Sequence, residues 1–273
     1  MQTVIIFSIL FIIVLLVAVH LLILPRLFRH RTVSKPFPDT WEKILVERFP
    51  VYLKLPAELK KQLQQLVNVF IENKEFVGCA DLEVNDEMKV LIAAQACLLL
   101  LNRPTHEYVD LRTIYLYPST FRATREVRDE LGLVSHQSHD LLGESWSNGK
   151  VILAWDDVEK GVRNFTDGFN VVLHEFAHQL DHESGVTNGA PLLYTKAAYK
   201  SWAYVLGKEF EKLQKSDPRK ESIIDHYGAT NPAEFFAVAT ETFFEEPDKL
   251  YKNHKALFEE LEKYYRLDPR EWL

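Results

Sequence analysis

The sequence predicts an α+β fold that is mostly helical and contains a small sheet. Helices are predicted at residues 56–73 and 85–101 and again from residue 170 onward. Between them, residues 109–117 and 150–155 are rich in β-branched and aromatic side chains, which is typical of strands. The order of helices, a small sheet and then helices indicates the α+β class.

The first predicted element is an uncharged run at residues 3–24, interrupted only by Ser8 and His20. As a helix, this run reaches roughly 33 Å, enough to cross the hydrocarbon core of a bilayer. A cleaved signal peptide is the alternative, but no Lys or Arg precedes the run and no small-residue cleavage site follows it. We therefore expect a retained transmembrane anchor at residues 1–25.

The charges that flank this run predict its orientation. All nearby basic residues follow it, namely Arg26, Arg29, Arg31 and Lys35. By the positive-inside rule, this pattern predicts a single-pass membrane protein whose folded domain is cytoplasmic. Residues 26–40, which contain two prolines, are expected to be a juxtamembrane linker, and residues 41–273 are long enough to form the folded domain. The net charge of −7 gives no reason to expect nucleic acid as a partner.

The remaining elements follow from local patterns. An apolar stripe runs along residues 56–73, through Leu59, Leu63, Leu66 and Phe70. Residues 85–101 begin with a capping Asn and are mostly apolar, so a buried helix is expected there. Further helices are predicted at about residues 170–181 and 194–215, from Asn231, and up to about residue 266. Residues 135–139 are expected to form a polar loop, in which His136 and His139 are a weaker candidate metal pair.

The segment from His174 to His178, His-Glu-Phe-Ala-His, carries the strongest functional signal. Residues four apart lie on one face of a helix, so both imidazoles can face one metal ion. Glu175 would then lie beside that ion, where it could deprotonate a water that the metal holds. The alternative is two histidines that are satisfied within a core helix, with Glu175 exposed.

A third metal ligand must come from another part of the chain. The residues after His178 lack the glycine and third histidine of the metzincin pattern. Asp181 lies one turn further along the same helix and is better placed to orient a ligand imidazole than to bind metal. Glu234 is the best candidate ligand. However, Asn231-Pro-Ala-Glu234 also fits a capping box, in which Glu234 would only cap its own helix.

Two segments resemble a known family. HEFAHQLD at residues 174–181 and YGATNPAEFFAVATETFF at residues 227–244 resemble the Mlc titration factor A family of zinc metallopeptidases. The second stretch is also similar to the protease domain of anthrax lethal factor. The likeness to the titration factors includes residues 142–146 and 151–157 and covers roughly residues 40–273.

This resemblance implies a gluzincin-like zinc peptidase domain at residues 41–273. His174, His178 and Glu234 would bind one Zn²⁺ ion, and Glu175 would be the general base that activates a water on that ion. Tyr227 would be a catalytic hydroxyl near the developing oxyanion, although a half-buried turn tyrosine is the alternative for this residue.

The implied function is hydrolysis of peptide bonds in a peptide or protein substrate. Residues 151–155 are then a candidate edge strand that pairs with extended substrate, or else an ordinary interior strand. The titration-factor relatives are associated with sequestering a transcriptional repressor. The alternative function is therefore a regulatory binding module with weak or no peptidase turnover and a regulatory protein partner.

Overall fold

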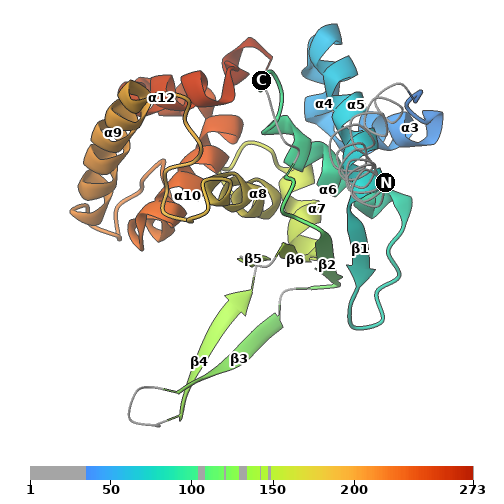
Figure 1. The fold of residues 1–273 in the computed structure, drawn as a ribbon, viewed down its shortest axis with the longest axis horizontal. Coiled ribbons are helices and arrows are strands. Elements are labelled where there is room, and N and C mark those ends of the chain that lie inside the picture. The colour runs from blue at the N-terminus through green and yellow to red at the C-terminus, as the bar shows by residue number, and fades with distance from the viewer. Residues whose placement is uncertain are drawn as a thin grey trace, which may run out of the picture.

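The computed structural model describes residues 35–103, 108–119, 121–128, 134–141, 143–146 and 149–272. It is mostly helical with a small sheet, so the predicted α+β class is confirmed (Figure 1). Among the described residues, helices α3 (Asp39–Arg48), α4 (Pro50–Lys54) and α5 (Ala57–Asn73) come first. After strand β1 (Glu75–Gly78), the chain forms α6 (Asp86–Leu98) and then the remaining strands.

The sheet has the strand order β1-β2-β6-β5, with β2 at Thr113–Tyr117, β6 at Lys150–Ala154 and β5 at Gly143–Trp146. Strands β1, β2 and β6 are parallel, and β5 is antiparallel to β6. Strand β6 therefore lies inside the sheet, and the interior alternative for residues 151–155 is the correct one. The edge-strand alternative is excluded because β5 pairs with β6 on the side opposite to β2, with Gly143 paired to Leu153.

Strands β3 (Phe121–Arg128) and β4 (Val134–Leu141) form a separate antiparallel pair. This pair extends away from the helices in Figure 1. Residues 135–139, which were expected to form a loop, lie in β4. A polar composition does not prevent a strand when a neighbouring strand satisfies its backbone groups.

The described chain after β6 is helical, with connecting loops. Helix α7 (Trp155–Arg163) follows β6 directly, so Trp155 begins a helix where the sequence predicted the end of a strand. Helices α8 (Val171–His182), α9 (Lys196–Gln214) and α10 (Pro232–Glu245) follow. The described part of the chain ends with α11 (Pro247–Asn253), α12 (Lys255–Tyr265) and a short 3₁₀ turn (Pro269–Glu271). Another 3₁₀ turn (His226–Ala229) precedes α10.

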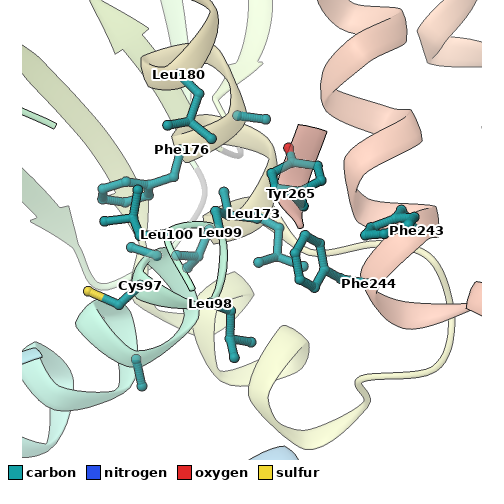
Figure 2. Close-up of a cluster of buried hydrophobic side chains, with 14 of the residues drawn as sticks. Cys97, Leu98, Leu99, Leu100, Leu173, Phe176, Leu180, Phe243, Phe244 and Tyr265 are labelled. Atoms are coloured by element: carbon teal, nitrogen blue, oxygen red, sulfur yellow. The ribbon is translucent and has the colours of Figure 1, made fainter. Parts of the chain in front are cut away.

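One apolar core packs helices α6, α8, α10 and α12 together. Figure 2 shows side chains of α6, α8, α10 and α12 gathered in one cluster, among them Phe176, Phe243, Phe244 and Tyr265. All four of these side chains are fully buried. Burying a large aromatic or aliphatic side chain contributes about 1.5–3 kcal/mol. The core thus fixes α8 and α10 against each other.

The predicted membrane location must be corrected. In the described parts of the chain, no helix is both long and apolar enough to cross a bilayer. Helix α9 has 19 residues but carries Lys and Glu along its length, and the apolar α6 has only 13 residues, when about 20 apolar residues are needed. A single-pass membrane protein is therefore not supported. Residues 3–24, on which that prediction rested, lie outside the described residues.

Candidate metal centre

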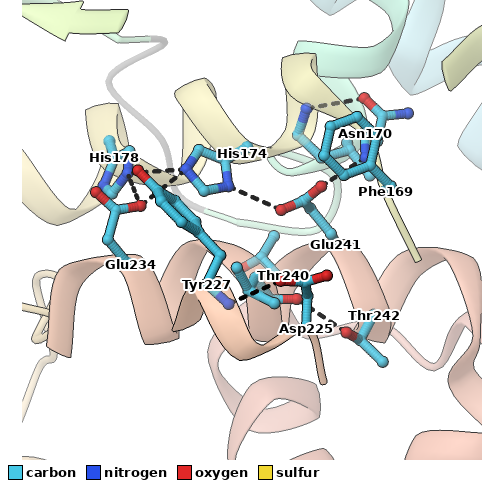
Figure 3. Close-up of polar contacts among 12 residues, drawn as sticks. Phe169, Asn170, His174, His178, Asp225, Tyr227, Glu234, Thr240, Glu241 and Thr242 are labelled. Atoms are coloured by element: carbon cyan, nitrogen blue, oxygen red, sulfur yellow. Dashed lines mark hydrogen bonds and ion pairs between the residues drawn. The ribbon is translucent and has the colours of Figure 1, made fainter. Parts of the chain in front are cut away.

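Helix α8 presents two imidazoles on one face. The side chain of Asn170 caps this helix by accepting hydrogen bonds from the backbone N–H groups of Val172 and Leu173. His174 and His178 lie one turn apart, and their Nε2 atoms are 3.2 Å from each other (Figure 3). The predicted helix and the predicted pairing of the two rings are both present in the structure.

Glu234 approaches the same point from the first turn of α10. Its Oε2 atom is 3.0 Å from Nε2 of His174 and 3.3 Å from Nε2 of His178. Helix α10 is capped by the side chain of Asn231, which accepts the backbone N–H of Glu234 at 3.0 Å. The capping function therefore belongs to Asn231, and the carboxylate of Glu234 is directed at the two imidazoles.

The spacing of these atoms suits a tetrahedral metal ion. The metal-ligating atoms of His174, His178 and Glu234 all lie within 4.8 Å of one another. Zinc binds imidazole nitrogen and carboxylate oxygen at about 2.0–2.1 Å, which puts tetrahedral ligand atoms roughly 3.3 Å apart. The observed separations of 3.0, 3.2 and 3.3 Å match this geometry. Among the described residues, this is the group of His, Cys, Asp and Glu side chains that could hold a metal ion.

The electrostatics also favour a cation. Burial alone would raise the pKa of Glu234, but the hydrogen bonds with His174 and His178 lower it to about 2. Burial alone would lower the pKa of His174, but the charge of Glu241 and hydrogen bonds with Glu234 and Glu241 raise it well above its usual value. The site thus concentrates negative charge around the imidazoles, where a metal ion can replace their protons.

Glu241 supports His174 from the side opposite to the candidate site. Its Oε1 atom is 2.8 Å from Nδ1 of His174, and its Oε2 atom accepts the backbone N–H of Asn170 at 2.5 Å. The carboxylate is almost completely buried, and this burial raises its pKa. Glu241 lies seven residues after Glu234 on α10, so the two carboxylates lie on the same face of that helix. A carboxylate at Nδ1 directs the lone pair of Nε2 toward the metal position.

Asp181 does not take the position that the sequence predicted for it. Its Oδ2 atom accepts the backbone N–H of Gly189 at 2.6 Å. No hydrogen bond joins it to His178, and both Oδ1 of Asp181 and Nδ1 of His178 are buried without a hydrogen-bond partner in the described structure. The prediction of an orienting contact was wrong because the loop after α8 folds back onto Asp181, a long-range feature that helical spacing does not reveal.

Glu175 and Tyr227 complete the group of predicted site residues. Glu175 is buried on α8, with 3% of its surface exposed, contrary to the alternative that left it in solvent. The ring of Tyr227 lies 5.9 Å from that of His174, and its phenol extends toward His178 and Glu234 (Figure 3). Burial and the nearby charges of Glu234 and Glu175 raise the pKa of Tyr227 to about 12. The phenol is therefore protonated at neutral pH and can donate a hydrogen bond.

Asn170 is a residue of this centre that the sequence analysis did not single out as a site residue. Besides capping α8, its Nδ2 atom donates to Gln95 on α6 and to Glu245 on α10, at 2.9 and 3.0 Å. Its own backbone N–H binds Glu241. The signal for a helix cap is visible in the sequence, but the contacts with α6 and α10 depend on tertiary packing.

The chain is similar in sequence to several known proteins. The Glucose-regulated metallo-peptidase M90 family matches residues 25–266. An uncharacterised protein of Synechocystis sp. is 39% identical over 238 residues, which cover 86% of each chain. Mlc titration factor A of Klebsiella pneumoniae is 33% identical over 233 residues, covering 84% of this chain and 86% of the relative. Mlc titration factor A of Escherichia fergusonii is 31% identical over the same length. The chain therefore belongs to the Glucose-regulated metallo-peptidase M90 family.

Proposed function

We propose that this protein is a zinc-dependent peptidase that hydrolyses peptide bonds in a peptide or protein substrate. The observation that carries the proposal is the convergence of His174, His178 and Glu234 at tetrahedral spacing. Membership of a metallopeptidase family supports it. We further propose that residues 41–273 form the peptidase domain.

Zinc is the metal that the donor set favours. Two neutral imidazoles and one carboxylate are a common protein ligand set of catalytic zinc and leave a fourth position open. Zinc bound there would act as a Lewis acid and lower the pKa of a coordinated water to about 7.

Glu175 and Tyr227 have complementary functions in this proposal. Glu175 is the general base that accepts a proton from the attacking water and later delivers it to the leaving amine. Its carboxylate is buried, and its charge contributes to the raised pKa values of His174 and Tyr227. Tyr227 donates a hydrogen bond from its protonated phenol to the oxygen on which negative charge develops. Its raised pKa is consistent with that donor function.

The sheet offers a place for the substrate backbone. Strand β5 is an edge of the described sheet and makes contacts with α8. An extended peptide could add to this edge through main-chain hydrogen bonds. We therefore assign to β5 the substrate-pairing function that the sequence analysis considered for residues 151–155.

A regulatory binding module is the second candidate function. The name Mlc titration factor A, which several relatives carry, favours it because titration describes binding of a protein partner. In this alternative, the surface of the protein sequesters a regulatory protein such as a transcriptional repressor, with weak or no hydrolysis. A bound metal would then support the shape of the site.

The substitution Glu175→Gln separates these functions. The amide that replaces the carboxylate cannot accept the proton, so cleavage of a peptide library, followed by mass spectrometry, should fall by at least about a hundredfold. Zinc content should remain equal to that of the wild type because Glu175 is not a ligand. Glu211→Gln, an exposed change on α9, is the control and should cleave normally.

Two results would decide against the proposal. Cleavage by Glu175→Gln at the wild-type rate would show that another group is the base. A zinc-loaded wild type that cleaves nothing, but retains a protein partner that Glu175→Gln also retains, would favour the binding module.

A further inference from the structure

Gly189 occupies an unusual place in the loop between α8 and α9. Residues 184–188 of this loop are exposed, whereas Gly189 is buried. Its φ angle is +78°, a left-handed conformation that L side chains rarely adopt. The loop therefore turns inward at this one residue.

Gly189 contacts three helices at this point. Its N–H donates to the buried carboxylate of Asp181 on α8 at 2.6 Å. Its carbonyl oxygen accepts the indole N–H of Trp202 on α9 at 2.8 Å. Its Cα faces Pro232 at the start of α10, so closely that a Cβ atom would lie 2.2 Å from the carbonyl oxygen of Pro232. No side chain larger than hydrogen fits between the loop and α10.

These contacts connect α8, which carries the two imidazoles, with α10, which carries Glu234. Asp181 lies three residues after His178 on α8, and Pro232 lies two residues before Glu234 on α10. Trp202, only 3% exposed, also packs against Phe236 of α10, with ring centroids 5.6 Å apart. A displacement of Pro232 would therefore shift the first turn of α10 and, with it, the carboxylate of Glu234.

We propose that Gly189 is a positioning residue that sets the distance between the imidazoles of α8 and the carboxylate of Glu234. This inference rests on the proposed metal site. Gly189 has no side chain that could bind a metal ion. It acts by allowing the backbone of the loop to approach α10 to a distance that any other residue would prevent.

The same loop contains a matched control. Gly185 also has a positive φ angle, +88°, but no atom lies within 4 Å of the position that a Cβ would take. Gly185→Ala therefore introduces the backbone strain of a positive φ without a steric contact. Gly189→Ala introduces similar strain together with the clash against Pro232. The difference between the two variants isolates the effect of that contact.

The test is the zinc affinity of the metal-free full-length variants, measured by competition with a chromophoric chelator. We expect Gly189→Ala to bind zinc at least about tenfold more weakly than Gly185→Ala, as for other changes that disturb ligand orientation. The Co²⁺-substituted protein should show a changed visible absorption spectrum in Gly189→Ala only. Equal zinc affinities in the two folded variants would overturn the inference, even if Gly189→Ala were less stable.

Trp202→Phe decides the question if Gly189→Ala does not fold. This change removes the indole donor to Gly189 and keeps an aromatic ring in the core, and Tyr204→Phe, an exposed change on the same helix, is its control. Zinc binding at least about threefold weaker than in Tyr204→Phe supports the inference. Unchanged affinity contradicts it.

A further comparison separates this inference from the proposed function. If the wild type binds zinc and His174→Ala does not, the metal site is established independently of Gly189. If the wild type binds no zinc, the proposed function itself fails.

Discussion

His174 is held on both sides of its ring. Nε2 faces Glu234 and His178, and Nδ1 faces the buried carboxylate of Glu241. This arrangement leaves the ring little freedom to rotate. When the ring is neutral, this arrangement favours the tautomer in which Nδ1 carries the proton and Nε2 is free to bind metal. The backbone N–H of Asn170 fixes Glu241 in turn.

The substitution Glu241→Gln tests this arrangement. A glutamine can accept a hydrogen bond at only one of its terminal atoms, so it loses one of the two contacts with His174 and Asn170. We expect zinc affinity to fall by about tenfold to a hundredfold. Glu245→Gln is the control, because Glu245 lies one turn further along α10 and makes its contacts with residues 168–170. Unchanged affinity in Glu241→Gln would show that Glu241 does not orient the ligand.

The substitution Tyr227→Phe tests the proposed oxyanion contact. It removes the phenolic hydroxyl and leaves the ring beside His174. The turnover number should fall by roughly a hundredfold or more, as when other oxyanion donors are removed. Zinc affinity should not change. Tyr204→Phe, an exposed tyrosine on α9, should have wild-type turnover, and an equally active Tyr227→Phe would rule out a catalytic hydroxyl.

At the residue scale, spacing in the sequence predicted only those site residues that lie close together in the chain. His174, Glu175 and His178 follow from helical geometry, and the structure brings the two imidazoles together. Glu234 fitted two patterns, a ligand and a cap, because Asn231-Pro-Ala-Glu234 satisfies both. Gly189 could not be found, because its importance depends on a contact with Pro232, which lies far along the chain beyond α9.

At the scale of the elements, α8 and α10 are joined at a second point beyond the metal centre. Glu245 at the end of α10 accepts the backbone N–H groups of Gly168 and Phe169 and the side-chain N–H of Asn170. Burial nevertheless raises the pKa of Glu245 to about 9. This carboxyl group is therefore largely protonated at neutral pH, and it connects α10 with the segment that leads into α8.

The titration of Glu245 predicts how stability depends on pH. The folded-state pKa of about 9 lies above the ordinary value of 4.5. The stabilising contribution is therefore fully present below about pH 4.5 and is lost as the pH rises through 9. The free energy of unfolding of the wild type should decrease between these values.

Glu245→Gln cannot ionise, so this part of the pH dependence should be absent from the variant. The measurement is urea unfolding from pH 5 to pH 9 with a chelator present, because metal binding depends on pH as well. Only the change of the unfolding free energy with pH is compared, and not its absolute value, because the amide changes the hydrogen bonds at every pH. If the free energy of unfolding changed with pH to the same extent in the wild type and in Glu245→Gln, the account would be contradicted.

The elements themselves were predicted with uneven success. The helix at residues 57–73 agrees with its apolar stripe, and the helix at residues 86–98 agrees with its capping Asn and its mostly apolar composition. Strand β1 is only four residues long and gave no recognisable pattern. The pairing of β1, β2 and β6 in parallel and the place of β5 beside β6 are long-range features. The tertiary fold decides such contacts, and local composition does not contain them.

At the scale of the whole molecule, the proposed metal centre brings together segments that are 60 residues apart, since His174 and Glu234 are in contact. A ligand that binds only the folded state stabilises it by mass action. We therefore expect zinc to raise the melting temperature of the full-length protein. At a free zinc concentration 100 times the dissociation constant, the gain is about 2.7 kcal/mol.

A chelator should reverse this gain, and thermal unfolding measures it. His174→Ala should unfold at the same temperature with zinc and with chelator, because the site has lost a ligand. A zinc response of equal size in His174→Ala would place the stabilising ion elsewhere in the molecule.

Composition was a less reliable guide at this scale. The uncharged run at residues 3–24 led to a predicted membrane location that the described helices do not support. By contrast, the α+β class depended on the order of many elements and was correct. A prediction that rests on several elements tolerates an error in any one of them.

The most direct test of the central claim is a crystal structure of the zinc-loaded protein with anomalous diffraction data collected at the zinc absorption edge. The account predicts a single strong anomalous peak within about 2.2 Å of Nε2 of His174, Nε2 of His178 and a carboxylate oxygen of Glu234. A structure in which Glu234 does not contact the ion, or in which zinc binds only at another site, would contradict it.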